Sequence, residues 1–295
     1  MARKGIVLTA GLGTRLHPMT LAVNKQLIPV YNKPMIYYAI WVLIKAGCRD
    51  IMLITSEADK SGFERLLGDG SHFGVNIAYR IQYVPNGLVD AFMQAEDFIA
   101  GDPCMLILGD NIFYGPGFPA MLAKAAAKTE GATVFGSIVP DPERFGVAET
   151  DASGKVISLE EKPKQPKSNC AVVGLYFFDG KVMQIAHELR KVIPADQEVS
   201  ITDVNRRYME AGQLDLQVFP AGFAWLDSGT YESLLEASNY VARVEREEGR
   251  VICCPEEAAF RAGFLPAEKL REYGEADKNN GYGQYMTRLY NEEAK

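Results

Sequence analysis

The feature that most constrains the fold is a repeated alternation between short, wholly apolar runs and longer amphipathic segments. Gly5 to Leu8 is the first such run, and Met105 to Leu108 has no polar face at all. Strands buried on both faces have such unbroken apolar sequences, whereas strands with one solvated face alternate apolar with polar residues. The pattern therefore predicts a mostly parallel, Rossmann-like α/β sheet with helices on both faces. Further strands are expected at 51–55, 133–139 and 214–219, and helices at 34–46, 88–99, 119–128, 201–210 and 230–248.

After about residue 140 the apolar runs come closer together. Turn residues separate them, which predicts a small antiparallel insertion that carries part of a site. Beyond residue 250 the segments are short and helical. We therefore expect a main domain at 1–240 and a C-terminal helical appendage at 241–295, whose sequence pattern by itself shows neither an oligomeric nor a regulatory role. The strands of the insertion are expected at 147–150, 156–160 and 171–178.

Charge and cysteine content exclude several classes of protein. The 295-residue chain has a formal net charge of −7, so we expect neither a nucleic-acid nor a membrane partner, both of which favour a basic surface. Its five cysteines form no C-x-x-C pair, so neither a disulfide framework nor a zinc site is indicated. The longest apolar run, Tyr37 to Ile44, is far too short to span a membrane, and no signal peptide is recognisable. We expect a cytoplasmic protein.

A glycine-rich loop, T-A-G-L-G-T-R-L at 9–16, follows the first expected strand. Glycine lets backbone N–H groups approach a phosphate closely. The P-loop pattern is absent, and Gly11-x-Gly13 lacks both the third glycine and the later acidic residue of a dinucleotide site. Arg15 and Lys25 place two cations near the loop, which suits a triphosphate. A structural turn with two solvated cations is the alternative at this point.

Two aspartates follow apolar segments. Asp110 comes after the strand at 105–108, at the carboxyl end of the expected sheet, where open α/β folds bind ligands. Asp227 follows Trp225 and Leu226. Each alone also fits an Asx turn, but beside a phosphate loop the two carboxylates together suit a hard divalent cation. The neighbouring pair Glu161 and Lys162 fits a solvated strand end on local pattern alone.

Taken together, these motifs resemble those of the glucose-1-phosphate thymidylyltransferases, which belong to the nucleotidyltransferase superfamily that makes nucleoside-diphosphate sugars. The likeness starts with G-I-V-L-T-A-G-L-G-T-R-L-H-P and K-Q-L-I-P-V-Y-N-K-P, and it covers nearly the whole chain in colinear order. Later motifs that carry it are L-G-D-N-I-F-Y-G at 108–115, D-P-E-R-F-G at 141–146, L-E-E-K-P at 159–163, I-T-D-V-N at 201–205, W-L-D-S-G at 225–229 and C-P-E-E at 254–257.

The resemblance implies transfer of a thymidylyl group from dTTP to glucose 1-phosphate, with Mg²⁺ as cofactor. It implies that Asp110 and Asp227 bind the Mg²⁺, that Glu161 binds sugar hydroxyls and that Lys162 binds the sugar phosphate. Gln82 and Gly87 would recognise the pyrimidine. The implied catalytic residues are Arg15, Lys25 and Lys162; the nucleotide-binding residues are Ala10, Gly11, Gly13, Thr14, Gln26, Gln82 and Gly87; the sugar-phosphate-binding residues are Asn111, Gly146, Glu161 and Val172.

Two alternatives stay open at this point. One is a sibling enzyme that uses UTP or another sugar 1-phosphate, and the other is a non-catalytic homologue that binds a sugar nucleotide for regulation. Family members are homotetramers that are often inhibited by a downstream dTDP-sugar at a second site, so the resemblance also implies a homo-oligomer, specifically a tetramer.

The chain departs from the family pattern at two positions. Ala10 stands where the pattern has a glycine, and Phe145 stands where tyrosine is common. If the φ angle of Ala10 is positive, its methyl group strains the backbone, and if φ is negative only crowding matters. Phe145 lacks a hydroxyl and therefore one hydrogen bond near the ligand.

Overall fold

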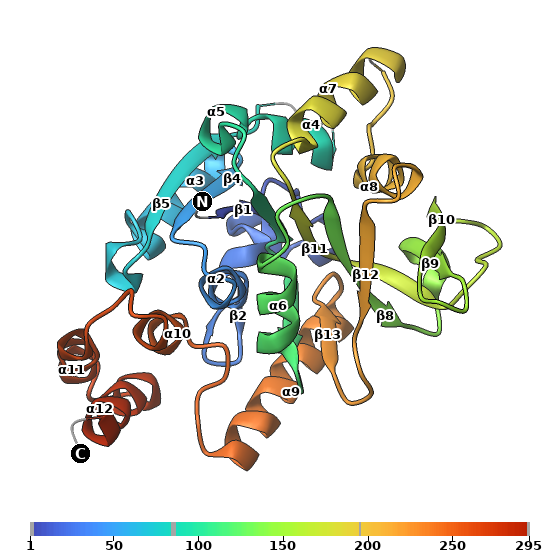
Figure 1. Ribbon diagram of the computed structural model, residues 1–295. Helices are drawn as coiled ribbons and strands as arrows, with labels where there is room; N and C mark the ends of the chain where they lie inside the picture. The colour runs from blue at the N-terminus through green and yellow to red at the C-terminus, as the bar shows by residue number, and fades with distance from the viewer. Residues whose placement is uncertain (1–2, 84–86, 195, 294–295) are drawn as a thin grey trace.

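The computed structural model describes residues 3–83, 87–194 and 196–293 and has a large central sheet with helices on both faces (Figure 1). At its centre β1 (Lys4–Leu8) lies between β4 (Asp50–Thr55) and β6 (Cys104–Leu108), and β5 (Asn76–Ile81) continues the sheet beyond β4. These neighbours all pair in parallel. The predicted Rossmann-like sheet is confirmed, and its first loop and Asp110 both follow carboxyl ends of neighbouring strands.

The other half of the sheet is partly antiparallel. β11 (Cys170–Phe178) pairs antiparallel with β6, β8 (Ala132–Ile138) and β9 (Gly146–Thr150). The expectation that 171–178 belongs to the small insertion alone is therefore wrong. β11 is long enough for one end to pair in the main sheet and the other to pair with β9, and almost all of it is buried. Only β9 and β10 (Val156–Glu161) form the hairpin of the expected insertion, and β12 (Leu214–Val218) pairs in parallel with β8.

Two short sheets complete the strand set in the described part of the chain. β7 (Asn111–Tyr114) pairs antiparallel with β13 (Ala224–Asp227), and β2 (Pro29–Val30) pairs with β3 (Lys33–Pro34). The sequence analysis did not predict the first pair. This pair of strands determines the geometry of the site, because its register places Asp227 opposite Asn111.

The five helices with predicted ranges are present close to those ranges, whereas the helices Glu57–Leu67 and Val182–Val192 were not predicted. The helix expected at 88–99 is two shorter helices, α4 (Leu88–Met93) and α5 (Glu96–Ile99). α8 (Ile201–Glu210) begins at a capping box formed by Ser200 and Asp203, as the sequence indicates. The remaining α-helices are α1 (Met19–Ala22), α2 (Ile36–Lys45), α3 (Glu57–Leu67), α6 (Phe118–Ala126), α7 (Val182–Val192), α9 (Tyr231–Glu248), α10 (Pro255–Arg261), α11 (Ala267–Ala276) and α12 (Gly281–Glu293). Single 3₁₀ turns are at Thr14–Leu16, Lys25–Leu27, Ser71–Phe73 and Pro142–Arg144.

The C-terminal helices pack on the helix layer that covers one face of the sheet. In Figure 1, α10, α11 and α12 lie on the side of α2 and β5. Their buried residues Ala258, Leu270 and Leu289 belong to the same hydrophobic cluster as Leu43 of α2 and Phe73. The expected boundary at 240/241 falls inside α9. Within the described ranges, none of the helices combines the length and the apolar character that crossing a bilayer requires.

Candidate active site

The glycine-rich loop leaves β1 at the carboxyl end of the sheet. Gly13 has a φ of 60°, and a Cβ there would lie 3.0 Å from Thr20 Cγ2, so this position needs glycine. Gly11 has no atom near its missing Cβ position, so this side of the loop is open to a ligand. Ala10 does not have a positive φ. Its methyl group therefore causes no left-handed strain, and Thr14 begins the 3₁₀ turn that carries Arg15.

A second loop brings a buried cation to the end of β6. Lys25 lies in a 3₁₀ turn capped by the side chain of Asn24, and its Nζ lies 2.6 Å from Asp110 Oδ2. The Lys25 side chain is only 7% exposed. The next residue, Gln26, is also buried, and its Oε1 has no hydrogen-bond partner among the described atoms. Because a buried acceptor without a partner is costly, Gln26 is available for a ligand.

Asp110 and Asp227 line the same cavity, and their charges interact. Burial raises the pKa of Asp227, and the negative charge of Asp110 raises it further, while Lys25, Arg15 and Arg144 act in the opposite direction. These effects mean that all four charged groups lie close to Asp227. Two carboxylates in a partly desolvated site repel each other, and a bound cation would offset that repulsion.

Arg15 reaches this group from the glycine-rich loop. A Cβ on Gly229 would lie 2.7 Å from Arg15 Nη2, so glycine at 229 leaves the room that the guanidinium occupies. The W-L-D-S-G motif therefore supplies the carboxylate of Asp227 and, at Gly229, the space in which the guanidinium of Arg15 lies. Two segments far apart in sequence meet here because β13 pairs with β7, which directly follows Asp110.

A cavity of about 260 Å³ opens beside the carboxylates. Glu161 lies at the end of β10, and its Oε2 accepts a hydrogen bond of 2.5 Å from Thr202 Oγ1. Lys162 has a φ of 43°, and its backbone N–H donates to Phe145 O over 2.9 Å. This sparsely populated conformation of a lysine marks a site where the surroundings fix the backbone. The predicted residues that line the cavity are Arg15, Asp110, Asn111, Gly146, Glu161, Lys162, Val172 and Asp227.

The predicted pyrimidine-recognition residues lie where the chain enters α4. Gln82 Nε2 lies 3.4 Å from Gly87 O, while residues 84–86 between them lie outside the described part of the chain. Gly87 has a φ of 94°, and a Cβ there would lie 2.3 Å from Glu198 Cγ. Glycine is therefore favoured at 87 by its backbone conformation, and a larger residue would also displace the side chain of Glu198. Leu88, the next residue, lines the cavity.

Thr202, Arg144 and Trp225 are among the cavity-lining residues for which the sequence analysis gave no role. Each lies in a motif that carries the family resemblance, which was the available signal. Thr202 and Trp225 have partners on other elements, whereas Arg144 pairs within its own 3₁₀ turn. Trp225 Nε1 donates to Asn111 Oδ1 over 2.7 Å, and Arg144 forms an ion pair with Asp141 over 2.6 Å.

For the substrates that the family resemblance implies, we predict that Thr202→Val raises the KM for glucose 1-phosphate roughly 10-fold or more, with little change in the KM for dTTP. The substitution keeps the shape of the side chain but removes the hydroxyl that holds Glu161, and a hydrogen bond to a charged group contributes about 1.5–3 kcal/mol. Steady-state kinetics with each substrate varied in turn measure the effect. Thr202→Ser keeps the hydroxyl and is the matched control. Equal KM values for Thr202→Val and wild type would mean that Glu161 does not depend on this bond.

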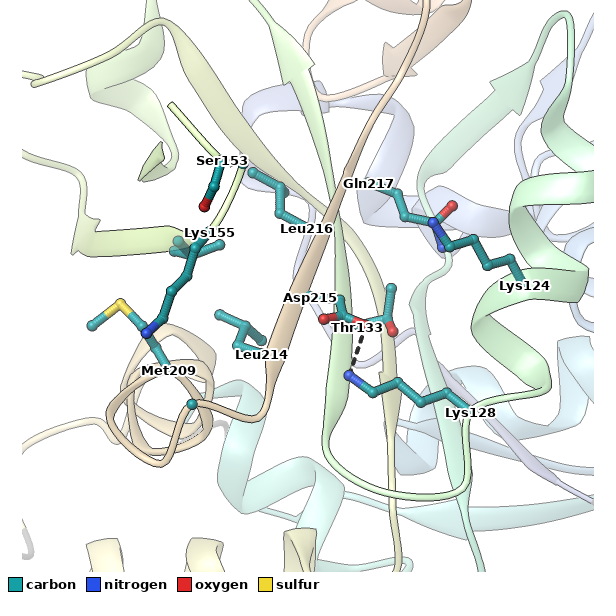
Figure 2. A pocket seen from close by; sticks show the side chains of 13 residues that line it. Lys124, Lys128, Thr133, Ser153, Lys155, Met209, Leu214, Asp215, Leu216 and Gln217 are labelled. Carbon is teal, nitrogen blue, oxygen red and sulfur yellow. Dashed lines mark hydrogen bonds and ion pairs between the residues drawn. The ribbon is translucent and has the colours of Figure 1, made fainter. Parts of the chain in front are cut away.

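A larger hollow of about 570 Å³ lies along β12, away from the carboxylate pair (Figure 2). It has basic side chains on both sides of the strand, Lys124 and Lys128 on one and Lys155 on the other. Lys128 is bound to Asp215 over 2.7 Å, the contact dashed in Figure 2. The residues around this hollow include none of the predicted site residues, so size does not identify the candidate active site.

Residues 4–244 match the family model of the nucleotidyl transferases. The chain therefore belongs to the nucleotidyl transferase family. It is 50% identical over 288 residues to a glucose-1-phosphate thymidylyltransferase of Xanthomonas campestris, with 97% of each protein covered. A protein of the same name from Neisseria meningitidis is 51% identical over 286 residues, which cover 97% of this chain and 99% of the relative.

Solved structures agree with these relatives. A structure described as a glucose-1-phosphate thymidylyltransferase of Bacillus anthracis in complex with sucrose superposes with a TM-score of 0.74 at 40% identity, covering 81% of this chain and 95% of the other. A UDP-glucose pyrophosphorylase complexed with UDP-glucose gives a TM-score of 0.71 at 26% identity, covering 83% and 100%. The predicted likeness to the thymidylyltransferases and the predicted fold class are confirmed.

Proposed function

We propose that this chain is a glucose-1-phosphate thymidylyltransferase that converts dTTP and glucose 1-phosphate to dTDP-glucose and pyrophosphate. The single observation that carries the proposal is the convergence of Arg15, Lys25 and the carboxylates Asp110 and Asp227 beside the cavity that Glu161 and Lys162 line. Relatives of that name, about half identical over nearly the full length, support it.

In the proposed reaction, a phosphate oxygen of glucose 1-phosphate forms a bond to the α-phosphorus of dTTP. The bond from that phosphorus to the α,β-bridging oxygen breaks, and pyrophosphate leaves with the electron pair. The attacking oxygen is already anionic at neutral pH, so no general base is required. Repulsion between two polyanions is the main obstacle, and in-line positioning with cationic groups overcomes it. Arg15 and Lys25 supply charge on the nucleotide side, and Lys162 supplies it on the sugar-phosphate side.

The residues present fit a magnesium ion. Asp110 and Asp227 are oxygen ligands with mutual repulsion that a cation would offset. No cluster of three or more acidic, histidine or cysteine ligands occurs within the described ranges, which suits an ion that Mg²⁺-type sites hold through one or two carboxylates plus substrate phosphates. When bound, the ion would neutralise phosphate charge. Lys25, which pairs with Asp110, would supply positive charge to the triphosphate.

The nucleotide-binding role proposed for the first loop rests on its open side at Gly11 and on the backbone that Gly13 permits. Gln26 contributes a buried acceptor without a partner among the described atoms, suited to a nucleoside hydroxyl or base N–H. The further proposed contacts in this set are Ala10, Thr14, Gln82 and Gly87 for the nucleotide, and Asn111, Gly146 and Val172 for the sugar phosphate.

A crossed assay tests the proposed substrates. We predict that kcat/KM for dTTP exceeds that for dUTP by roughly 10–200-fold, because the two bases differ by one methyl group in a fitted pocket. The ribose hydroxyl of UTP adds a steric difference. Pyrophosphate release is measured for each nucleotide with glucose 1-phosphate and with a second sugar 1-phosphate. A preference for UTP would assign the chain to the sibling enzyme, and binding without turnover of any pair would assign it to the regulatory homologue.

Three further expectations belong to the same proposal. We place the protein in the cytoplasm as a homo-oligomer, specifically a tetramer. We divide it into a catalytic domain at 1–240 and a C-terminal helical segment at 241–295, with α9 continuous across that boundary. Size measurement of the purified protein tests the tetramer directly.

A further inference from the structure

A chain of hydrogen bonds links the sugar side of the cavity to the carboxylate pair. Trp225, on β13, donates its indole N–H to Asn111 Oδ1 over 2.7 Å. The backbone N–H of Gly174 reaches the same oxygen from β11 over 3.3 Å. Asn111 in turn donates from Nδ2 to Asp110 Oδ1 over 2.9 Å. Lys25 holds the other oxygen of the same carboxylate, Oδ2, over 2.6 Å.

The two donors on Asn111 Oδ1 fix the orientation of its amide. An asparagine side chain has one acceptor oxygen and one NH₂ group. If the amide were flipped, its NH₂ would face the indole N–H of Trp225 and the N–H of Gly174, donor against donor. Asn111 is 4% exposed, so water cannot readily compensate for such a clash. The amide therefore keeps its NH₂ toward Asp110.

We propose that Trp225 is a positioning residue for the divalent cation: through Asn111 it holds the Asp110 carboxylate in the orientation that binds the metal. This inference rests on the proposed function, which makes Asp110 a metal ligand. Some groups do not contact the metal but hydrogen-bond to its ligands and orient them. Removing such a group commonly changes metal affinity 10–100-fold. Without the indole N–H, one of the two bonds that oppose an amide flip is lost, and Asp110 loses its donor in the flipped state.

The ring of Trp225 also forms part of the sugar side of the site. Phe145 packs against it with ring centroids 5.0 Å apart and an interplanar angle of 63°. Both rings line the cavity. The same residue thus contacts the wall of the proposed sugar pocket through its ring and the proposed metal site through its N–H, so the two contributions need separate tests.

The test measures Mn²⁺ binding by the loss of the free-ion EPR signal, with saturating dTDP-glucose and no pyrophosphate, so that no turnover occurs. We expect Trp225→Phe to weaken Mn²⁺ binding about 10-fold. Trp41→Phe makes the same chemical change at the other of the two tryptophans and should leave Mn²⁺ binding unchanged. Under turnover, Trp225→Phe should need more Mg²⁺ and recover most of its kcat at high Mg²⁺.

The outcomes separate the inference from the proposed function. Wild-type Mn²⁺ affinity in Trp225→Phe, together with weakened affinity in Asp110→Asn, would overturn the positioning role and leave the metal site standing. Unchanged affinity in both variants would remove Asp110 from the metal site itself. If Trp225→Phe folds poorly, benzothienylalanine at 225 decides, because it keeps the ring shape and lacks only the N–H. A change confined to the KM for glucose 1-phosphate would make Trp225 a wall of the sugar pocket and nothing more.

Discussion

Asp110→Asn is expected to lower kcat at least about 100-fold at ordinary Mg²⁺ concentrations, with partial recovery as Mg²⁺ is raised. The amide oxygen that replaces the carboxylate is neutral and is a weaker ligand for a hard cation. Losing charge stabilisation where the transition state forms costs rates of this order. The measurement is initial rate across a Mg²⁺ titration for the variant and for wild type.

The fold should tolerate this change. The variant loses the ion pair between Asp110 and Lys25, but it also removes the repulsion that raises the pKa of Asp227. Because these effects offset one another, we expect the melting temperature to move by no more than about 4 °C. Asp215→Asn is a matched control, since it also breaks an aspartate–lysine pair, over 2.7 Å to Lys128, but far from the cavity. Near-normal activity of Asp110→Asn at ordinary Mg²⁺ would exclude Asp110 from the metal site.

Lys162→Ala is expected to raise the KM for glucose 1-phosphate roughly 10–100-fold, to lower kcat and to leave the KM for dTTP within about 3-fold. The hypothesis places this ammonium group on the sugar phosphate, and hydrogen bonds between charged partners contribute about 1.5–3 kcal/mol. Alanine is the suitable replacement because residue 162 has a φ of 43°. Glycine would relax the backbone at the same time and confuse the two effects.

The control for this prediction lies on the neighbouring loop. Lys167 pairs with Glu160 over 2.6 Å and is exposed, so Lys167→Ala removes a lysine near the same strand without touching the cavity. It should behave as wild type. If the KM change in Lys162→Ala fell mainly on dTTP instead, the roles of Lys162 and Lys25 would have to be exchanged.

The parallel half of the fold was predictable because it depends on local pattern. Buried strands such as β6 have unbroken apolar sequences, and the capping box of α8 involves only the four consecutive residues 200–203. The place of β11 was not predictable, because an apolar run does not say which neighbours it pairs with. Its length lets it join the main sheet at one end and the hairpin at the other.

The candidate site shows the same division. Motifs identified the charged residues, since Arg15, Asp110 and Asp227 each lie in a recognisable segment. The hydrogen bonds that hold the side chains of the site in place could not be inferred, because they join segments that are distant in the sequence. Thr202 and Glu161 are 41 residues apart, and Trp225 and Asn111 are 114 apart. Only the pairing of β7 with β13 and the packing of α8 on β10 bring these residues together.

The shared core of α2 and the C-terminal helices has a consequence for how the protein is made. The apolar side of α2 packs against α10, which carries Ala258, as well as against the sheet. Yet α2 leaves the ribosome more than two hundred residues before Ala258. During synthesis, the part of the chain that precedes α10 therefore exposes some of its apolar core to solvent until the C-terminal helices have been made. A stop codon just after α9 would leave that apolar surface permanently exposed. The shortened chain should therefore aggregate, although every proposed catalytic residue is present.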